Sequence, residues 1–485
     1  MKKIQYICTL LFGVMVLLFF GGAYPHHLHY QEQYQLFLFD HTYVWEIVRR
    51  PGGVADLLGR FCTQFFLFAW VGAAIIALLL SLVQLLTLRL FNGQSLKFKA
   101  QSSWLSQAAK PSAKFKVECF YGLSFVPAFL LWIFLLDENA LLGGVWAVLL
   151  TLLAVWGYTL LPKGWTQRIV ILVSLPMLYW LVGPDWNGSH YYRYPKVFPA
   201  LLYAAWLSAI VLPLIVHVCQ KWVSASTDGK HFTFHFSLIT FALVAIIMGI
   251  FVWKNTNFKA EKVMQYDFMA RHQQWNRILE AINIEKPNNQ IGVTVQNLAL
   301  AMHGQLVNHI FDYNQNGIAG LLPVVQSDAT SPLSTAEVHY QLGMIAVAQR
   351  TVFEAQEAIL DFQKSGRCYK RLAQTNLILG SYKVARKYLM ALQKTLFYRD
   401  WANETLPLLG NEEAIDKHPE YGRLRQMVCN EDYYFSDQVT PEMLETLYES
   451  NKDNLLALEY LKAYYVLTGD RENYAKLLLQ TSAKQ

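Results

Sequence analysis

Seven runs of mostly apolar residues fill the first half of this sequence, and they limit the folds open to it more than any other feature. They lie at roughly 4–23, 64–90, 119–136, 140–161, 168–183, 199–219 and 232–253. A helix needs about 20 such residues to cross the hydrocarbon core, because each backbone polar group must be satisfied within the segment. We therefore expect about seven transmembrane helices, of which the short 168–183 run, with Pro176, has the least sharp bounds.

Composition divides the chain near Trp253. Of its 485 residues 54% are apolar and only 16% charged, whereas soluble domains carry about 25% charge. Residues 1–253 hold 17 of the 41 Lys and Arg and 9 of the 35 Asp and Glu, so the net charge is +8 there and −2 in the remainder. The basic surplus belongs to the apolar half and does not indicate a nucleic-acid partner. The sequence predicts a transmembrane domain over 1–253 and a near-neutral globular domain over 254–485.

Basic residues also set the expected orientation, because cytoplasmic loops retain Lys and Arg. With the N-terminus in the cytoplasm, 12 of the 17 basic residues of the first half lie in inner segments and 5 in outer loops. An odd number of spans then places 254–485 on the outer face. Lys254, Lys259 and Lys262, just beyond the last span, would also lie there, which runs against the preference of basic residues for the inner face. The N-terminal run also fits a cleavable signal peptide, which would leave six spans and the same location for the C-terminal domain.

Amphipathic helical patterns follow Phe258, without alternating strands, and these patterns repeat. Two segments have the small-and-large spacing by which paired helices pack in tetratricopeptide repeats: Tyr340, Leu342, Gly343, Ala346, Ala355, Ile359 and Phe362, and then Gly380, Tyr382, Ala385, Leu389 and Leu392. The equivalent turns are taken as Gln273, Gly304, Arg350, Gly380 and Gly469. Their separations of 31, 46, 30 and 89 residues compare with about 34 in an ideal repeat.

Residues 258–482 therefore resemble a degenerate tetratricopeptide array, an α-solenoid that usually presents a concave face to a peptide or protein. An irregular helical cap over the membrane domain is the alternative. The expected fold class is all-α, with a polytopic transmembrane domain followed by this extracytoplasmic array.

The first outer loop, residues 24–64, is longer and more aromatic than a plain connector. Its apolar residues from Leu36 to Val48 predict a helix lying in the membrane interface, with Tyr43 and Trp45 at headgroup depth. Pro51-Gly52-Gly53 would end that helix, and residues 54–61 would begin a second one.

This layout resembles polytopic glycosyltransferases that use lipid-linked sugars, which carry an acidic residue in the first outer loop on helices along the membrane. The resemblance implies that Asp40, or else Asp56, acts as general base toward an acceptor hydroxyl or holds a divalent metal at the donor phosphate. About seven spans are few for that fold, and no paired Asp-Glu motif occurs in the loop. The same residues fit a structural role, in which Asp40 caps a helix and Asp56 pairs with Arg60.

A second outer loop, residues 185–196, carries Arg193, Lys196 and His190. On the outer face these side chains would contact a phosphate of a lipid-linked donor, or else anchor the loop to lipid headgroups.

No resident cofactor or metal site is predicted outside the transferase alternative. The six cysteines lack a metal-binding spacing, and Cys368 and Cys429 would lie in the outer domain as a disulfide or as two buried thiols. The absence of a Walker loop, a GxSxG and an HExxH motif disfavours nucleotide hydrolysis, serine hydrolysis and zinc proteolysis.

Several short segments carry a resemblance to a family: Pro51-Gly52-Gly53 continuing through Asp56, Phe61, Thr63, Gln64 and Phe65; Asn297-Leu298-Ala299-Leu300 with Gly304; Lys387-Tyr388-Leu389; and Trp401-Ala402. The chain resembles a family of uncharacterised multi-pass inner-membrane proteins of Bacteroidota. The resemblance implies a periplasmic C-terminal domain and contributes no catalytic residue. We expect an envelope adaptor or assembly factor whose repeats bind a periplasmic or membrane protein, with the lipid-linked sugar transferase as the alternative.

Overall fold

The computed structural model of the chain describes residues 2–101, 121–162, 164–184, 191–194, 196–222, 232–323, 331–360, 363–429 and 440–482. Within these ranges the regular structure is helical, apart from isolated β-bridges. The chain divides into two compact units. Unit 1 comprises Met1–Glu32 and Phe39–Phe258, and unit 2 comprises Gln33–Leu38 and Lys259–Gln485. The all-α class is confirmed for the described residues.

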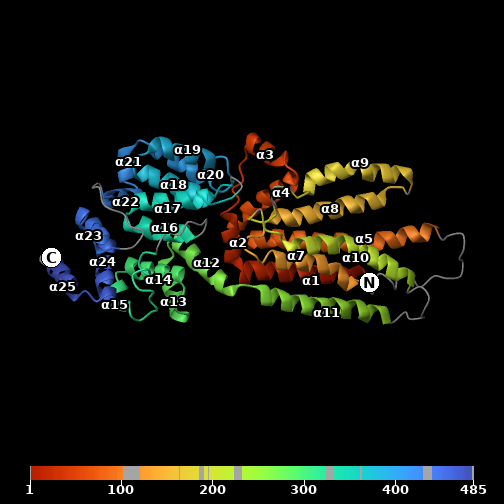
Figure 1. Cartoon of the computed structure of the whole chain (residues 1–485), viewed down its shortest axis with the longest axis horizontal. Coiled ribbons are helices and arrows are strands. Elements are labelled where there is room, and N and C mark those ends of the chain that lie inside the picture. The colour runs from red at the N-terminus through yellow and green to blue at the C-terminus, as the bar shows by residue number, and fades with distance from the viewer. Residues whose placement is uncertain are drawn as a thin grey trace. The chain divides into compact units, whose positions relative to one another are not determined.

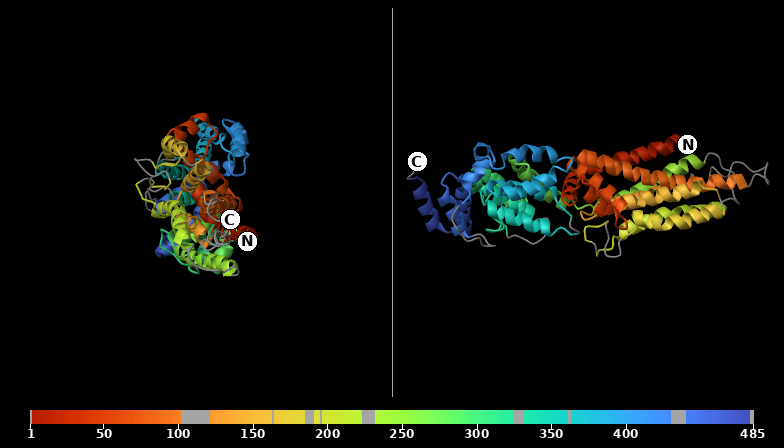
Figure 2. Two further views of the ribbon diagram at one scale, coloured as in Figure 1. Left: turned by 90° about the vertical axis from the view of Figure 1, so that its right-hand side faces the viewer. Right: turned by 90° about the horizontal axis from the view of Figure 1, so that it is seen from above.

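Unit 1 consists mainly of long apolar helices that lie side by side along a common direction (Figures 1 and 2). Its helical elements are α1 (Lys2–Leu18), the π-helical η1 (Phe19–Ala23), α2 (Pro25–Glu32), α3 (His41–Val48), α4 (Gly53–Thr63), the 3₁₀ turn η2 (Gln64–Leu67), α5 (Ala69–Gln101), the 3₁₀ turn η3 (Tyr121–Phe125), α7 (Val126–Phe134), α8 (Leu142–Leu160), α9 (Trp165–Val182), α10 (Ala200–Trp222) and α11 (Phe232–Asn255).

Four helical segments of the described residues are long and apolar enough to cross a membrane: Gln5–Ala23, Ala69–Phe91, Leu142–Leu160 and Trp165–Val182. A fifth arises if the bent pair of α11 and the helix that follows it counts as one span, and shorter apolar helices occupy Tyr121–Phe134 and Ala200–Val216. Each apolar run of the sequence thus coincides with a helix, and four of the runs meet the length criterion by themselves.

Aromatic packing and a buried polar chain hold the centre of unit 1 together. Phe12 of α1 packs edge-on against Phe129 of α7, with 5.0 Å between ring centroids. Nearby, the Thr9 hydroxyl donates to Oε1 of Gln84 at 2.9 Å, and Nε2 of Gln84 donates to Oγ of Ser124 at 2.9 Å. Because a polar group without a partner is costly in an apolar interior, this chain of hydrogen bonds fixes α1, α5 and η3 in register.

The loop helix α4 reaches α8 through two glycines. A Cβ atom at Gly59 would lie 2.4 Å from the backbone nitrogen of Gly143, and one at Gly143 would lie 3.2 Å from Cα of Asp56. Only glycine at position 59 allows so close an approach of two helix backbones. The contact therefore places the α4 segment that carries Asp56 directly against α8.

Unit 2 is built from shorter helices, most of them in pairs. They are α12 (Phe258–Arg271), whose first residue still belongs to unit 1, α13 (Trp275–Ile284), α14 (Gln290–Met302), α15 (Leu306–His309), α16 (Ser331–Leu342), α17 (Ile345–Glu357), α18 (Gly366–Ile378), α19 (Tyr382–Leu392), α20 (Arg399–Thr405), the 3₁₀ turn η5 (Leu406–Leu408), α21 (Glu412–Asp416), α22 (Tyr421–Met427), α23 (Pro441–Ser450), α24 (Leu455–Thr468) and α25 (Arg471–Ser482).

The same tight turn joins five helix pairs in the described part of unit 2. A residue with left-handed backbone, φ between +53° and +88°, ends the first helix of each pair: Gln273, Gly304, Gly343, Gly380 and Gly469. The N–H of the next residue donates to the carbonyl five residues back at 2.8–2.9 Å, and the left-handed residue itself donates three residues back. This pattern is the Schellman motif, which satisfies the last carbonyls of the helix and reverses the chain.

Successive helices of these pairs pack on one another. α16 packs against α17, α17 against α18, and α18 against α19, and Figure 1 shows them in consecutive layers. Apolar side chains of α16, α17 and α18 share one cluster that includes Ala336, Ala355 and Leu372. Small residues at such positions let neighbouring helices approach closely.

The structure corrects one expected repeat turn. Arg350 does not mark a turn: it lies within α17, where its Nε donates to Oε1 of Glu354 at 2.8 Å. The equivalent turn is at Gly343, so the five turns are 31, 39, 37 and 89 residues apart. The assignment was wrong because it followed the even spacing of a loose repeat, whereas the turn itself needs a residue that tolerates positive φ.

A second correction concerns the first outer loop. The sequence predicted one helix from Leu36 to Val48, but residues 35–40 are not helical and α3 begins at His41. Asp40 caps α3, and the preceding Gln33–Leu38 segment belongs to unit 2. Leu36, Phe37 and Leu38 are instead buried outside any helix, whereas Phe39 is exposed.

Substituting the turn glycines tests the shared geometry. A Cβ atom at Gly343 would lie 2.6 Å from Cβ of Met427, whereas nothing lies within 4 Å of one at Gly380. Gly380→Ala should lower the free energy of unfolding by about 1–2 kcal/mol, the cost of left-handed backbone. Gly343→Ala should lower it by at least about 1 kcal/mol more, because the contact adds overpacking. Denaturant unfolding of the full chain measures both, and equal costs would contradict the assigned contact.

Candidate functional site

The sequence-based candidate Asp40 stands at the start of α3, where it is half-buried. Its Oδ1 accepts hydrogen bonds from the backbone N–H of Thr42 at 3.0 Å and of Tyr43 at 3.3 Å, and from the Thr42 hydroxyl. These are the bonds of a helix N-cap, which satisfies donors that have no partner within the helix. The capping role expected for Asp40 is confirmed.

The second candidate, Asp56, is engaged by a basic side chain of its own helix. Nε of Arg60 lies 3.0 Å from both carboxylate oxygens of Asp56, and Nη2 lies 2.9 Å from Oδ2. Both side chains are buried, and Tyr43 forms a hydrogen bond with the same guanidinium. The pairing of Asp56 with Arg60 expected from their four-residue spacing is confirmed. The hydrogen bond between Tyr43 and Arg60 joins α3 to α4.

In the second loop, residues 185–196, Arg193 lies close enough to Glu138 for its charge to act on that carboxyl. The backbone N–H of Arg193 donates to the carbonyl of Asn139 at 2.8 Å, and its guanidinium stacks on Tyr194. Burial and the charge of Asp137 raise the pKa of Glu138, and the Arg193 charge lowers it in part. Lys196 is exposed, and His190 lies outside the described residues.

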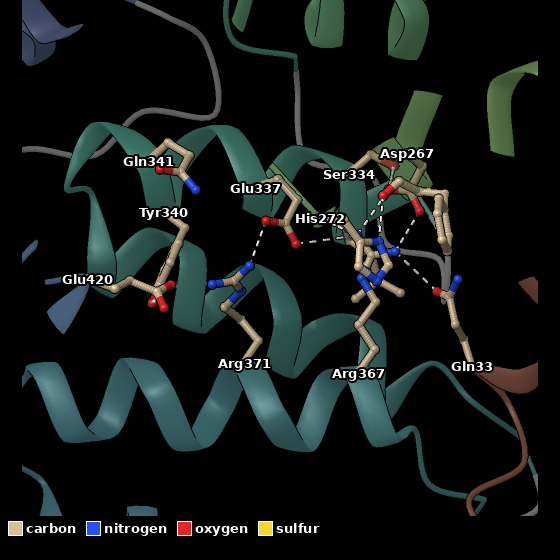
Figure 3. A network of polar contacts seen from close by, with 12 residues as sticks. Gln33, Asp267, His272, Ser334, Glu337, Tyr340, Gln341, Arg367, Arg371 and Glu420 are labelled. Atoms are coloured by element: carbon tan, nitrogen blue, oxygen red, sulfur yellow. Dashed lines mark hydrogen bonds and ion pairs between the residues drawn. The ribbon is translucent and has the colours of Figure 1, made fainter. Parts of the chain in front are cut away.

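A second cluster of charged residues, which the sequence did not single out, lies inside unit 2 and is drawn in Figure 3. Its centre is Arg367 of α18. Nη1 and Nη2 of Arg367 reach Oδ2 and Oδ1 of Asp267 on α12 at 2.6 and 3.0 Å, and Ser334 donates to the same carboxylate at 2.6 Å. The parallel pair of bonds fixes both the position and the plane of the guanidinium.

The cluster continues one helical turn along α18. Nη2 of Arg371 lies 2.5 Å from Oε2 of Glu337 on α16, and Nη2 of Arg367 lies 3.4 Å from the other oxygen of Glu337. The guanidinium of Arg371 also lies 3.6 Å from the ring centroid of Tyr340, whose hydroxyl donates to Glu420 at 2.9 Å. Figure 3 shows Arg367 and Arg371 pointing from one face of α18 toward α16. We call Asp267, Glu337, Arg367 and Arg371 the buried charge cluster.

Electrostatics keep all four members of this cluster charged. Burial alone would raise the pKa of Asp267 and Glu337, but the charges and hydrogen bonds of Arg367 and Arg371 outweigh it, so the pKa of both carboxyls is lowered. The pKa of Arg367 is raised: its burial acts to lower the value, and Asp267 more than compensates. Two cations and two anions balance, so the cluster offers no net charge to a ligand.

Arg367 also contacts a segment that lies far from it in the sequence. Its Nη1 donates to Oε1 of Gln33 at 3.2 Å, and the backbone N–H of Leu36 donates to the carbonyl of Lys364, just before α18, at 2.9 Å. Gln33 and Leu36 belong to the Gln33–Leu38 segment, which is contributed by the first outer loop and is part of unit 2. We call this segment the strap.

The Asp56–Arg60 pair and the buried charge cluster each hold helical segments together. Among the described residues, no group of three or more His, Cys, Asp and Glu side chains is placed to hold a metal ion. Cys368 beside Arg367 is a buried free thiol, and burial raises its pKa to about 11, so it is not a nucleophile at neutral pH. The one available sequence signal for the buried charge cluster was the i, i+4 pair Arg367 and Arg371, a pattern that more often marks a solvated helix face.

These features define a class before any relative is considered: an all-helical protein, over the described residues, with apolar helices of membrane-spanning length and a unit of paired helices stabilised by buried charges. The chain belongs to a family of unknown function, DUF6057, which it matches over residues 2–186 and 184–485. No curated protein and no solved structure matches the chain.

Removing Arg367 tests the buried charge cluster. Arg367→Met leaves Asp267 as a buried carboxylate without its main partner, which typically costs about 3–5 kcal/mol of unfolding free energy. Lys417→Met is the matched control, because Lys417, the residue after α21, pairs with Glu413 in an exposed salt bridge whose loss should cost less than about 1 kcal/mol. Denaturant unfolding of the full chain gives both values. Similar losses of unfolding free energy for the two substitutions would show that Arg367 stabilises the fold no more than an exposed salt bridge does.

Acid should destabilise unit 2 through His339. This residue of α16 is buried, and burial lowers its pKa to about 4 from the ordinary 6.5. Between these values the unfolded chain binds a proton that the folded chain does not, so stability falls as pH falls, by up to about 1.4 kcal/mol per pH unit. His339→Gln should reduce that slope by the contribution of this one group, and His303→Gln, at an exposed position, should leave it unchanged. The measurement is the free energy of unfolding from pH 7 to pH 4. Equal dependence on pH in the two substituted chains would refute the role of His339.

Proposed function

We propose that this chain is an integral inner-membrane protein of a diderm cell envelope that acts as an adaptor or assembly factor. Unit 1 crosses the membrane seven times, with the N-terminus in the cytoplasm. Unit 2 is a tetratricopeptide-like α-solenoid in the periplasm that binds a protein partner. The observation that carries the proposal is the recurrence of one Schellman turn in five helix pairs.

Recurrent helix pairs favour protein binding over catalysis on physical grounds. Each pair leaves an apolar face that only the next pair covers, so an array of pairs forms an extended surface suited to long peptide or protein contacts. Spacings of 39 and 37 residues between consecutive turns are close to the length of one tetratricopeptide unit. The 89-residue interval holds α19 to α24, in which α20 to α22 form an inserted group.

The strap supports the proposed topology through a parity argument. Leu36 is bonded to Lys364, so the first loop and the helix pairs of unit 2 lie on the same side of the membrane. The chain between Leu38 and Lys259 must then cross the bilayer an even number of times. Six of the seven apolar runs fall in that stretch. If all six cross, the run before the first loop brings the total to the proposed seven spans, with unit 2 on the side opposite the N-terminus.

Unit 2 also exposes large apolar side chains that a partner would cover. Ile284 at the end of α13 is 89% exposed, Phe311 after α15 is 73% exposed, and Leu455 at the start of α24 is 66% exposed. These residues lie outside the apolar helices of unit 1, so contact with lipid tails does not account for them. Apolar anchors of this size contribute a large part of the binding energy at protein interfaces.

Cross-linking in cells tests the adaptor. The tagged full chain should recover a partner at a level comparable to its own, and Ile284→Asp together with Phe311→Asp should lower that recovery at least fivefold, because a charge would be buried at the interface. Lys417→Asp, at an exposed polar position of unit 2, should change it less than twofold. Quantitative mass spectrometry of the recovered material measures the ratio. Recovery of no protein at a comparable level would count against an adaptor of any kind.

A further inference from the structure

The strap is a non-helical segment that packs with a helical unit to which it is not adjacent in sequence. Gln33 and Arg367 are 334 residues apart, yet they share a buried hydrogen bond. All six residues of the strap are buried, with Tyr34 and Gln35 at 2% exposure and Leu36, Phe37 and Leu38 at 6–8%. The strap therefore makes the kind of contact that an extended peptide ligand makes with a helical repeat.

Two bonds fix the register of the strap. The side chain of Gln33 accepts from Arg367 Nη1, and three residues later the backbone N–H of Leu36 donates to the carbonyl of Lys364. Both partners lie at the beginning of α18. The other end of the face shared by α16 and α18 is covered by α22, where Arg423 donates to Gln341 at 3.1 Å. The strap and α22 thus contact opposite ends of this face.

We propose that the strap occupies the peptide-binding site of unit 2, and that an extended segment of the partner, with the same chemistry, takes its place. This inference rests on the proposed function and names the kind of segment that the adaptor binds. The segment carries a neutral amide side chain opposite Arg367, a free backbone N–H three residues later opposite Lys364, and apolar side chains after it. The strap is then a resident competitor that keeps the site filled until a partner arrives.

The surroundings of Arg367 explain the preference for a neutral amide. Asp267 and Glu337 already balance the charges of Arg367 and Arg371 within the buried charge cluster. An aspartate or glutamate in place of Gln33 would add a third buried anion, and like charges in a buried site are strongly unfavourable. A glutamine supplies the acceptor that Arg367 needs without that charge.

Tethering sets how strongly the strap competes. Because both of its ends are joined to unit 1, the strap binds within the same chain and needs no encounter between separate molecules. A free peptide of the same sequence must displace it. Weakening the strap by a substitution outside the binding face should therefore raise the apparent affinity for free peptide, without changing any residue that lines the site.

The test uses the full chain in detergent and a fluorescent peptide of residues 31–39 with a Lys-Lys tail for solubility. Leu36→Pro in the chain removes the N–H that Lys364 accepts. Fluorescence anisotropy should show at least tenfold tighter binding of the peptide to L36P than to the unsubstituted chain. A peptide with Pro in place of Leu36, or with Glu in place of Gln33, should bind L36P at least tenfold more weakly. These matched peptides separate site binding from partition into micelles.

The melting curve of L36P shows whether unit 2 remains folded, and Gln33→Ala in the chain replaces it if it does not. Equal affinity for the substituted and unsubstituted chains would overturn the proposal, as would equal affinity of L36P for the three peptides. Either result leaves the adaptor itself standing if cross-linking still recovers a partner, which would then bind elsewhere on unit 2. If cross-linking recovers no partner but the peptide binds tightly and selectively, the adaptor proposal is rejected and the peptide-binding site is retained.

Discussion

The bidentate salt bridge between Arg367 and Asp267 is the interaction on which unit 2 depends most. It joins α12 to α18, and Glu337 extends it to α16. A guanidinium taken out of water is tolerated only when all its donors find acceptors, so these helices have one arrangement in which the charges are satisfied. Apolar packing alone would allow several arrangements of these helices. The charges therefore specify which helices meet, while the apolar clusters supply most of the favourable free energy.

The helix-pair turns impose the complementary local constraint. Each requires one residue in the left-handed region, which is why glycine occupies four of the five positions identified among the described residues. Gln273 is the exception, with φ +53°, and it shows that the hydrogen bonds of the motif can hold a residue with a side chain in that conformation. Turn chemistry decides where a pair reverses, and charge pairing decides which pairs meet.

Much of the fold could be predicted from the sequence, because the governing signals are local. Apolar runs placed the long helices, the N-cap of Asp40 and the four-residue spacing of Asp56 and Arg60 gave their contacts, and glycines marked three of the five turns. The strap and the buried charge cluster could not be predicted. Both depend on contacts between residues up to 334 positions apart. A charged residue in a sequence is indistinguishable from a solvated one until its partner is placed.

The strap also has a consequence for the order in which the chain is made, inserted and folded. Gln33 leaves the ribosome 334 residues before Arg367, an interval of roughly 20 to 70 seconds at ordinary rates of synthesis. With the topology proposed above, the first loop must already be on the correct side of the membrane throughout that interval and must stay there without its partner. A chain that inserted one helix in the wrong direction would separate the two by a bilayer, and unit 2 would be left with an incomplete interior. Under that topology, the contact makes the completion of unit 2 around α18 conditional on the correct insertion of the first helix.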